Sequence, residues 1–271
     1  MVDCAAPTER RCASRSRSLM RMGEQLSFSL SAADAGLHCY GASAGNALVL
    51  GGESGGVRAG CAITRVEGVE DSFELSVEGI CEGRLEALGP AWSQPFGGRR
   101  QWLCRLRGAS AGGGELKGFG EVTLGAAELG GLALRRRLWV CFDPELAFSV
   151  VAERRRARDG HGDEEVAAYL GRGGPLAAVA IEEPRLSSTY RDDGQLLRAG
   201  LELWEADGED ESEDGEAESY DRMRALRVAG ETIVAGELGS GGAVEISVAF
   251  LAWHHDGRGG AGAYVIETAG R

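Results

Sequence analysis

The stretch that decides the fold runs from Val244 to Glu267, with the sequence V-E-I-S-V-A-F-L-A-W-H-H-D-G-R-G-G-A-G-A-Y-V-I-E. Its first part alternates residue types with the period of two that is typical of a half-buried strand. Asp256-Gly257 is a tight-turn signal, and Ala263–Glu267 has the pattern of a returning strand. The stretch therefore predicts an antiparallel hairpin with a glycine-rich turn.

The same kind of pattern recurs along the chain of 271 residues, which contains 43 glycines and only 6 prolines. Many tight turns between short strands favour an antiparallel sandwich or barrel, and the lack of strands alternating with long helices excludes doubly wound α/β folds. We predict an all-β fold with one short helix over Asp163–Leu170. Asp163 would be the N-cap of this helix, and acidic residues fill its first turn.

Composition divides the chain into segments. Residues 1–24 are rich in Arg and Ser and lack the apolar region of a secretory signal. They are expected to form a disordered tail or to precede a true start at Met20 or Met22. The segment A-S-A-G-G-G at 109–114 is the predicted boundary between an N-terminal β-domain, 25–108, and a C-terminal β-domain, 115–271.

Charge and cysteine content restrict the partners and the compartment. The formal net charge is −13, but residues 205–221 form an acidic loop with ten acids and no base. The rest of the chain is therefore close to neutral, which argues against a nucleic-acid partner. The seven cysteines form no C-x-x-C pair, a pattern that indicates reduced thiols in a cytoplasmic protein. No apolar run has the length of a membrane span.

Polar residues at the end of the predicted strand are the candidate site. His254 and Asp256 are two residues apart and can share a face, so an imidazole could orient a carboxylate for acid–base chemistry. The alternative is a solvated turn made by Asp256-Gly257. Adjacent His254 and His255 point to opposite faces, so we predict no metal. Gly257–Gly262 matches G-x-G-x-x-G, but no helix follows to bind a dinucleotide, and we predict no cofactor.

Three stretches resemble the lipocalin-like superfamily of carotenoid 1,2-hydratases (hydroxyneurosporene synthases) and related bacterial proteins. They are Gly118–Val122, Leu138–Phe142 and the C-terminal W…DG…GAYVIE from Trp253 to Glu267. The resemblance implies two consecutive lipocalin-like barrels or sandwiches and an isoprenoid-like or other apolar ligand. The family often carries an Arg-Asp-His-Ser-Trp-like cluster between its halves. The matching region here, Leu134–Trp139, has three arginines and no Asp or His.

The leading hypothesis is a lipocalin-like protein that binds a small apolar molecule. As an enzyme it would be a cofactor-independent hydratase, cyclase or isomerase, with Asp256 as the acid and His254 as its orienting partner. The predicted ligand-binding residues are aromatic: Trp253, Tyr264, Trp139 and Trp204. The alternative is a non-catalytic interaction or scaffolding protein that uses a sheet edge or the acidic loop. A cavity of roughly a few hundred Å³ opening near Trp253 favours the first hypothesis, and a solid core with an exposed apolar patch favours the second.

Overall fold

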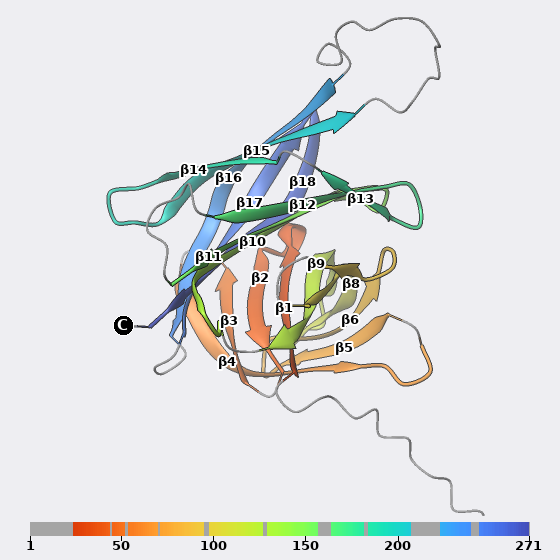
Figure 1. The fold of residues 1–271 in the computed structure, drawn as a ribbon. Helices are drawn as coiled ribbons and strands as arrows, with labels where there is room; N and C mark the ends of the chain where they lie inside the picture. The colour runs from red at the N-terminus through yellow and green to blue at the C-terminus, as the bar shows by residue number, and fades with distance from the viewer. Residues whose placement is uncertain are drawn as a thin grey trace, which may run out of the picture.

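The computed structural model describes residues 24–43, 45–51, 54–69, 71–94, 98–126, 129–156, 164–181, 184–206, 223–239 and 244–270. In this part the chain forms two antiparallel sheets of nine strands each, and the only helix is a single 3-10 turn at Ala33–Ala35. Figure 1 shows the first sheet, in red to yellow-green, beside the second, in green to blue. The predicted all-β fold is confirmed. The predicted tail and most of the predicted acidic loop lie outside the described residues.

The first sheet is a closed barrel. Its strands are β1 (Glu24–Ala32), β2 (Leu37–Ala42), β3 (Gly45–Gly51), β4 (Ser54–Arg65), β5 (Ser72–Val77), β6 (Cys81–Ala87), β7 (Trp92–Ser93), β8 (Arg100–Ser110) and β9 (Glu115–Ala126). β1 pairs with β9, and β6 pairs with β8, so eight strands close the ring and β7 lies outside it along β8. Inward side chains such as Phe28, Phe73 and Trp102 fill the barrel.

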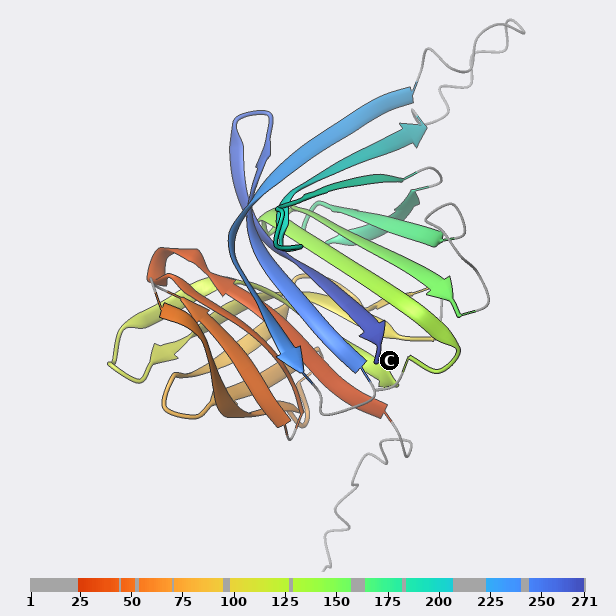
Figure 2. The same cartoon turned by 90° about the vertical axis from the view of Figure 1, so that its left-hand side faces the viewer.

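The second sheet is curled but open. Its strands are β10 (Leu132–Asp143), β11 (Leu146–Arg155), β12 (Glu165–Arg172), β13 (Ala177–Ile181), β14 (Arg185–Tyr190), β15 (Leu196–Ala206), β16 (Met223–Gly239), β17 (Val244–His255) and β18 (Arg258–Ala269). Their order is β13-β12-β11-β10-β18-β17-β16-β15-β14, so β13 and β14 are the edges. Figure 2 shows this sheet curling over itself beside the barrel.

The prediction of a short helix over Asp163–Leu170 was wrong. Glu165–Arg172 is strand β12, which pairs with β11 on one side and β13 on the other. Ala168 and Leu170 point into the core of the second sheet. The acidic start of the segment is only a local helix signal, and pairing with the exposed edge of β11 outweighs it. Asp163 lies outside the described residues.

The change of sheet comes later in the chain than the sequence pattern indicated. Residues 111–114 form a hairpin turn between β8 and β9, and β9 completes the first barrel by pairing with both β8 and β1. The chain passes to the second sheet between Ala126 and Leu132. A glycine-rich segment occurs both in hairpin turns and in connections between sheets, so its sequence does not distinguish the two.

The C-terminal hairpin lies near the middle of the second sheet. β17 pairs with β18 through a two-residue turn in which Asp256 and Gly257 have φ angles of 45° and 77°. Two of the following glycines of β18 make room for aromatic neighbours: a Cβ on Gly260 would lie 2.8 Å from the ring of Phe142, and one on Gly262 would lie 2.8 Å from Nε1 of Trp253. The glycine motif is therefore a turn followed by a packing surface.

The two sheets pack on each other through a third apolar cluster. Trp139 and Phe250 of the second sheet, with Tyr40 and Leu103 of the first, belong to it. Alternate residues of β10, β17 and β18 thus face either this interface or the concave interior of the second sheet.

The cysteines of the described part are free thiols, and four of the five are buried: Cys39, Cys81, Cys104 and Cys141, with Cys61 half-buried. The described residues contain no helix that is long and apolar enough to cross a membrane.

Candidate functional site

The concave face of the second sheet holds a cavity of about 500 Å³. Strands β16, β17 and β18 supply part of its wall, and β14, β15 and the turn between them supply the rest. Its apolar lining includes Leu196, Ala235, Ala249 and Ile266. Polar side chains line it as well, and a cavity of this volume is large enough for a small organic molecule.

Tyr264 is the aromatic side chain that β18 places in this wall, and only 1% of it is exposed to solvent. Its hydroxyl accepts a hydrogen bond from Nη1 of Arg136, at 3.2 Å. Burial raises the pKa of Tyr264 to about 12, although the guanidinium of Arg136 acts in the opposite direction. The phenol is therefore protonated at neutral pH and can donate a hydrogen bond.

Arg136 itself is held by a carboxylate. It forms an ion pair with Glu164, the residue just before β12, and the side chains of Arg136 and Glu164 are 13% and 2% exposed. Its neighbours Arg135 and Arg137 lie on the other face of β10, because side chains alternate along a strand. The positive charge behind Tyr264 is thus already compensated within the protein.

Tyr190 completes the polar end of the cavity. It lies at the end of edge strand β14 and lines the cavity, as Tyr264 does. The Ser188 hydroxyl donates to the Tyr190 hydroxyl at 3.4 Å. Two phenols from different strands of the curled sheet, β14 and β18, therefore line the same cavity.

The charged residues that line the cavity are acidic. Asp193 belongs to the turn between β14 and β15 and Glu237 to β16, and both are exposed. Oδ1 of Asp193 accepts a hydrogen bond from the backbone N–H of Gln195 at 3.0 Å, which fixes this turn. The lining therefore carries negative charge near solvent, and of its two phenols Tyr264 is buried whereas Tyr190 is 43% exposed.

The predicted acid–base residues lie at the tip of the β17–β18 hairpin. Asp256 is in the turn with 82% of its side chain exposed, and its carboxylate lies 3.5 Å from Nε2 of His255. His254 is also exposed. Along β18, Asp256 is eight residues from Tyr264, or about 26 Å in an extended strand. The structure therefore pairs Asp256 with His255, away from the cavity, and the catalytic role of Asp256 and His254 stays a prediction.

The predicted ligand-binding residues lie in different environments. Of the four, Tyr264 lines the cavity. Trp253 is fully buried in the core of the second sheet, where Gly230 and Gly262 make room for its ring. Trp139 lies at the interface between the sheets, and its indole N–H donates to the Ser29 hydroxyl at 2.6 Å.

Trp204 is on β15, and the guanidinium of Arg185 lies 5.9 Å from the centre of its ring. Of the four aromatic residues predicted to bind the ligand, Tyr264 belongs to the described lining of the cavity. The sequence pattern did not identify the other polar residues of this lining. The sequence did contain a signal for Arg136, since Arg135–Arg137 are three consecutive arginines in an apolar strand. Side chains alternate along a strand, so Arg136 must point to the face opposite to that of its two neighbours.

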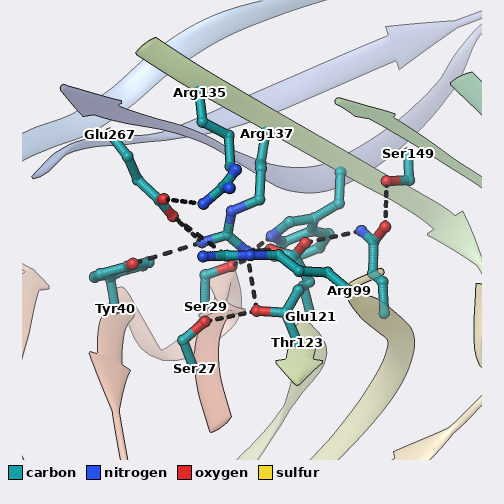
Figure 3. Close-up of polar contacts among 12 residues, drawn as sticks. Ser27, Ser29, Tyr40, Arg99, Glu121, Thr123, Arg135, Arg137, Ser149 and Glu267 are labelled. Carbon is teal, nitrogen blue, oxygen red and sulfur yellow. Dashed lines mark hydrogen bonds and ion pairs between the residues drawn. The ribbon is translucent and has the colours of Figure 1, made fainter. Parts of the chain in front are cut away.

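A second polar cluster lies between the two sheets (Figure 3). Arg137 is at its centre, with Nη2 3.1 Å from Glu267 and Nη1 3.3 Å from Glu121. Arg135 contacts Glu267 at 3.0 Å and Glu153 at 2.6 Å, and Arg99 lies 3.8 Å from Glu267.

Burial raises the pKa of Glu121. For Glu267, the three guanidinium groups outweigh the effect of burial and lower the pKa. Glu121 belongs to the first sheet, whereas Arg137 and Glu267 belong to the second. This cluster therefore joins the sheets.

No group of three or more His, Cys, Asp or Glu side chains within the described ranges could hold a metal ion.

Comparisons with known proteins give similarity in fold alone. No family model matches the chain, and no curated protein matches it in sequence. Among solved structures, the crystal structure of CghA with Sch210972 matches with a TM-score of 0.55 and 11% sequence identity. The match covers 91% of this chain and 88% of that one. At this identity the similarity supports the arrangement of the two sheets and leaves the chemistry of the site to the residues of this chain.

Proposed function

We propose that this protein binds a small, largely apolar molecule in the cavity of its second sheet. The observation that carries the proposal is the cavity of about 500 Å³, whose wall combines apolar side chains such as Leu196 and Ile266 with the phenols Tyr264 and Tyr190 and other polar groups. A cavity of this kind has the volume of a drug-sized ligand. CghA, with a similar fold, has been solved with Sch210972, and this supports a ligand-binding use of the architecture.

We place the ligand in this cavity and not in the polar cluster between the sheets, because the polar groups of the two places differ in their contacts. Around Arg137, guanidinium and carboxylate groups satisfy one another and link the sheets. Around Tyr264, the hydroxyl contacts lie at the wall of an open space. A group that already bonds its neighbours and has no adjacent space is a structural element, whereas a donor at a cavity wall is available to a ligand.

Two variants test the proposal. Ser247 lines the cavity, and Ser247→Phe places a ring inside it. Ser76, exposed on the outer face of β5, is the matched control as Ser76→Phe. The purified proteins are compared by native mass spectrometry for a co-purified apolar molecule. We expect the ligand in the wild type and in Ser76→Phe, and its loss from Ser247→Phe. Equal ligand content in all three proteins would contradict the proposal.

A catalytic extension keeps the acid role of Asp256 with His254. The carboxylate–imidazole contact that the structure has at the hairpin tip joins Asp256 to His255, at 3.5 Å, and His254 is exposed beside it. Conversion of an unsaturated apolar ligand by hydration, cyclisation or isomerisation requires a proton donor within hydrogen-bond reach, so this role requires the ligand to react at the hairpin tip and not beside Tyr264.

A scaffolding role is the second candidate, and one observation favours it. The edge strand β13 exposes Ala177, Ala178, Val179 and Ala180, with Val179 51% exposed. Natural edge strands commonly carry charges, prolines or bulges that prevent pairing with another chain. An uncharged edge of this kind can pair with the same edge of a second copy of this chain.

A further inference from the structure

We propose that the ligand is an uncharged molecule with a carbonyl oxygen, and that the hydroxyl pair of Tyr264 and Tyr190 donates a hydrogen bond to this oxygen. The inference rests on the proposed ligand site and adds the chemical class of the ligand. Ketones, esters, lactones and quinones belong to this class.

The direction of the hydrogen bonds at the cavity wall supports a donor site. Arg136 donates to Tyr264 at 3.2 Å, and Ser188 donates to Tyr190 at 3.4 Å. Each phenol therefore accepts a hydrogen bond from a neighbouring group, which leaves its own proton available to a ligand in the cavity. Consecutive hydrogen bonds polarise one another and strengthen the last donor.

The charges near the phenols disfavour an anionic ligand. Glu164 compensates the guanidinium of Arg136, so no unpaired positive charge attracts a carboxylate to Tyr264. Asp193 and Glu237 add negative charge to the lining, and the lining in the described part of the chain contains no Arg, Lys or His. A carboxylate would therefore lose its hydration without gaining an ion pair, which is unfavourable.

A cationic ligand is disfavoured for a different reason. An ammonium group has donors and no acceptor, so it cannot accept a hydrogen bond from a phenol. Asp193 and Glu237 could hold a cation at the solvent side of the cavity, but this would leave the phenol protons without an acceptor. A neutral carbonyl oxygen, which accepts and carries no charge, fits the inner end of the cavity.

The test uses four probes with one aromatic skeleton. The first is an acyl-dimethylaminonaphthalene ketone, whose fluorescence shifts to longer wavelength when its carbonyl accepts a hydrogen bond. The others replace the acyl group with a carboxylate, with an aminomethyl group that is protonated at neutral pH, or with an alkyl chain. Affinity and emission are measured with the full-length wild type, Tyr190→Phe and Tyr264→Phe. Tyr169→Phe is the matched control, because the Tyr169 hydroxyl donates to the Ser93 carbonyl away from the cavity.

We expect the ketone to bind the wild type at least about tenfold more tightly than the carboxylate or the ammonium probe. Tyr190→Phe and Tyr264→Phe each weaken ketone binding by about fivefold to tenfold, as expected for loss of one hydrogen bond, and shift the bound emission to shorter wavelength. The alkyl probe binds all variants equally. Tyr190 is 43% exposed, so its variant keeps the inference testable if Tyr264→Phe unfolds.

The outcomes separate this inference from the proposed function. If no probe binds and Ser247→Phe retains the co-purified ligand, the ligand site itself is wrong. If the alkyl probe binds as tightly as the ketone and the tyrosine variants leave emission unchanged, the site exists and the carbonyl inference is overturned. Tighter binding of the carboxylate or ammonium probe overturns it as well.

Discussion

Nη1 of Arg137, on the second sheet, lies 3.3 Å from Oε2 of Glu121, on the first, and the two side chains are 2% and 1% exposed. A charge pair this far from solvent is strongly coupled to its surroundings, because each ion loses its hydration and depends on its partner. Arg137 also contacts Glu267, so one guanidinium serves carboxylates of both sheets. The relative position of the sheets therefore depends on Arg137.

Substitution of Arg137 is expected to destabilise the whole fold. Arg137→Met leaves Glu121 and Glu267 without their shared cation, and breaking a buried pair in this way costs about 3–5 kcal/mol. The free energy of unfolding, measured in urea, gives the effect. In the double variant Arg137→Met/Glu121→Gln the stranded carboxylate is removed, and part of the loss should return. Additive effects of the two substitutions would show that the residues are not coupled.

The fold was largely predictable because alternation is a local signal. The hairpin from Val244 to Glu267, with its turn at Asp256-Gly257, forms as its pattern predicts. The strand β12 was mistaken for a helix because its partner β11 lies elsewhere in the sequence and no local feature records the pairing. The closure of the barrel by β1 and β9 depends on pairing between residues far apart in the sequence, such as Glu24 and Ala126.

The site was less predictable than the fold. Tyr264 was named from its place beside the hairpin, whereas Tyr190 and Glu164 reach the site only through the curl of the second sheet. Short sequence signals identify polar residues at turns such as Asp256, and they do not show which residues the curled sheet brings together across the cavity.

His38 should make stability depend on pH. Its side chain is 3% exposed, its ring lies 5.1 Å from that of Phe250, and Nδ1 is 3.0 Å from the Ser31 hydroxyl. Burial lowers the pKa of His38 from 6.5 to about 4. Between these values the unfolded chain binds a proton that the folded protein does not, so stability falls as the pH is lowered from 6.5 to 4.

The loss attributable to His38 is on the order of 3 kcal/mol when the pH falls from 7 to 4. His38→Gln removes the titrating group and keeps a polar partner for Ser31. Urea unfolding of both proteins across this pH range should give a smaller loss for the variant by about that amount. Parallel pH dependences would show that His38 does not titrate differently in the folded protein.

The exposed edge of β13 can be tested by a charge. Val179→Lys places a lysine at the centre of the strand, which is how natural edge strands prevent pairing. If the scaffolding role holds, the wild type associates through this edge and Val179→Lys is monomeric in light scattering. Val57 is similarly exposed, on β4 of the first barrel, and Val57→Lys is the control. A monomeric wild type, or the same association in both variants, removes the support for this role.

Asp256→Asn separates catalysis from binding. Asp256 has a φ of 45°, and Asn adopts this left-handed conformation as readily as Asp, so the turn and the unfolding free energy should be unchanged. The carboxylate lies about 26 Å along β18 from Tyr264, so affinity for the ketone probe should also stay within about twofold of the wild type. If Asp256 is the acid, the Asp256→Asn variant should no longer convert the co-purified molecule. Mass spectrometry measures this conversion. Conversion at the wild-type rate would instead exclude Asp256 as the acid, and loss of conversion in Tyr264→Phe alone would place the reaction at the cavity.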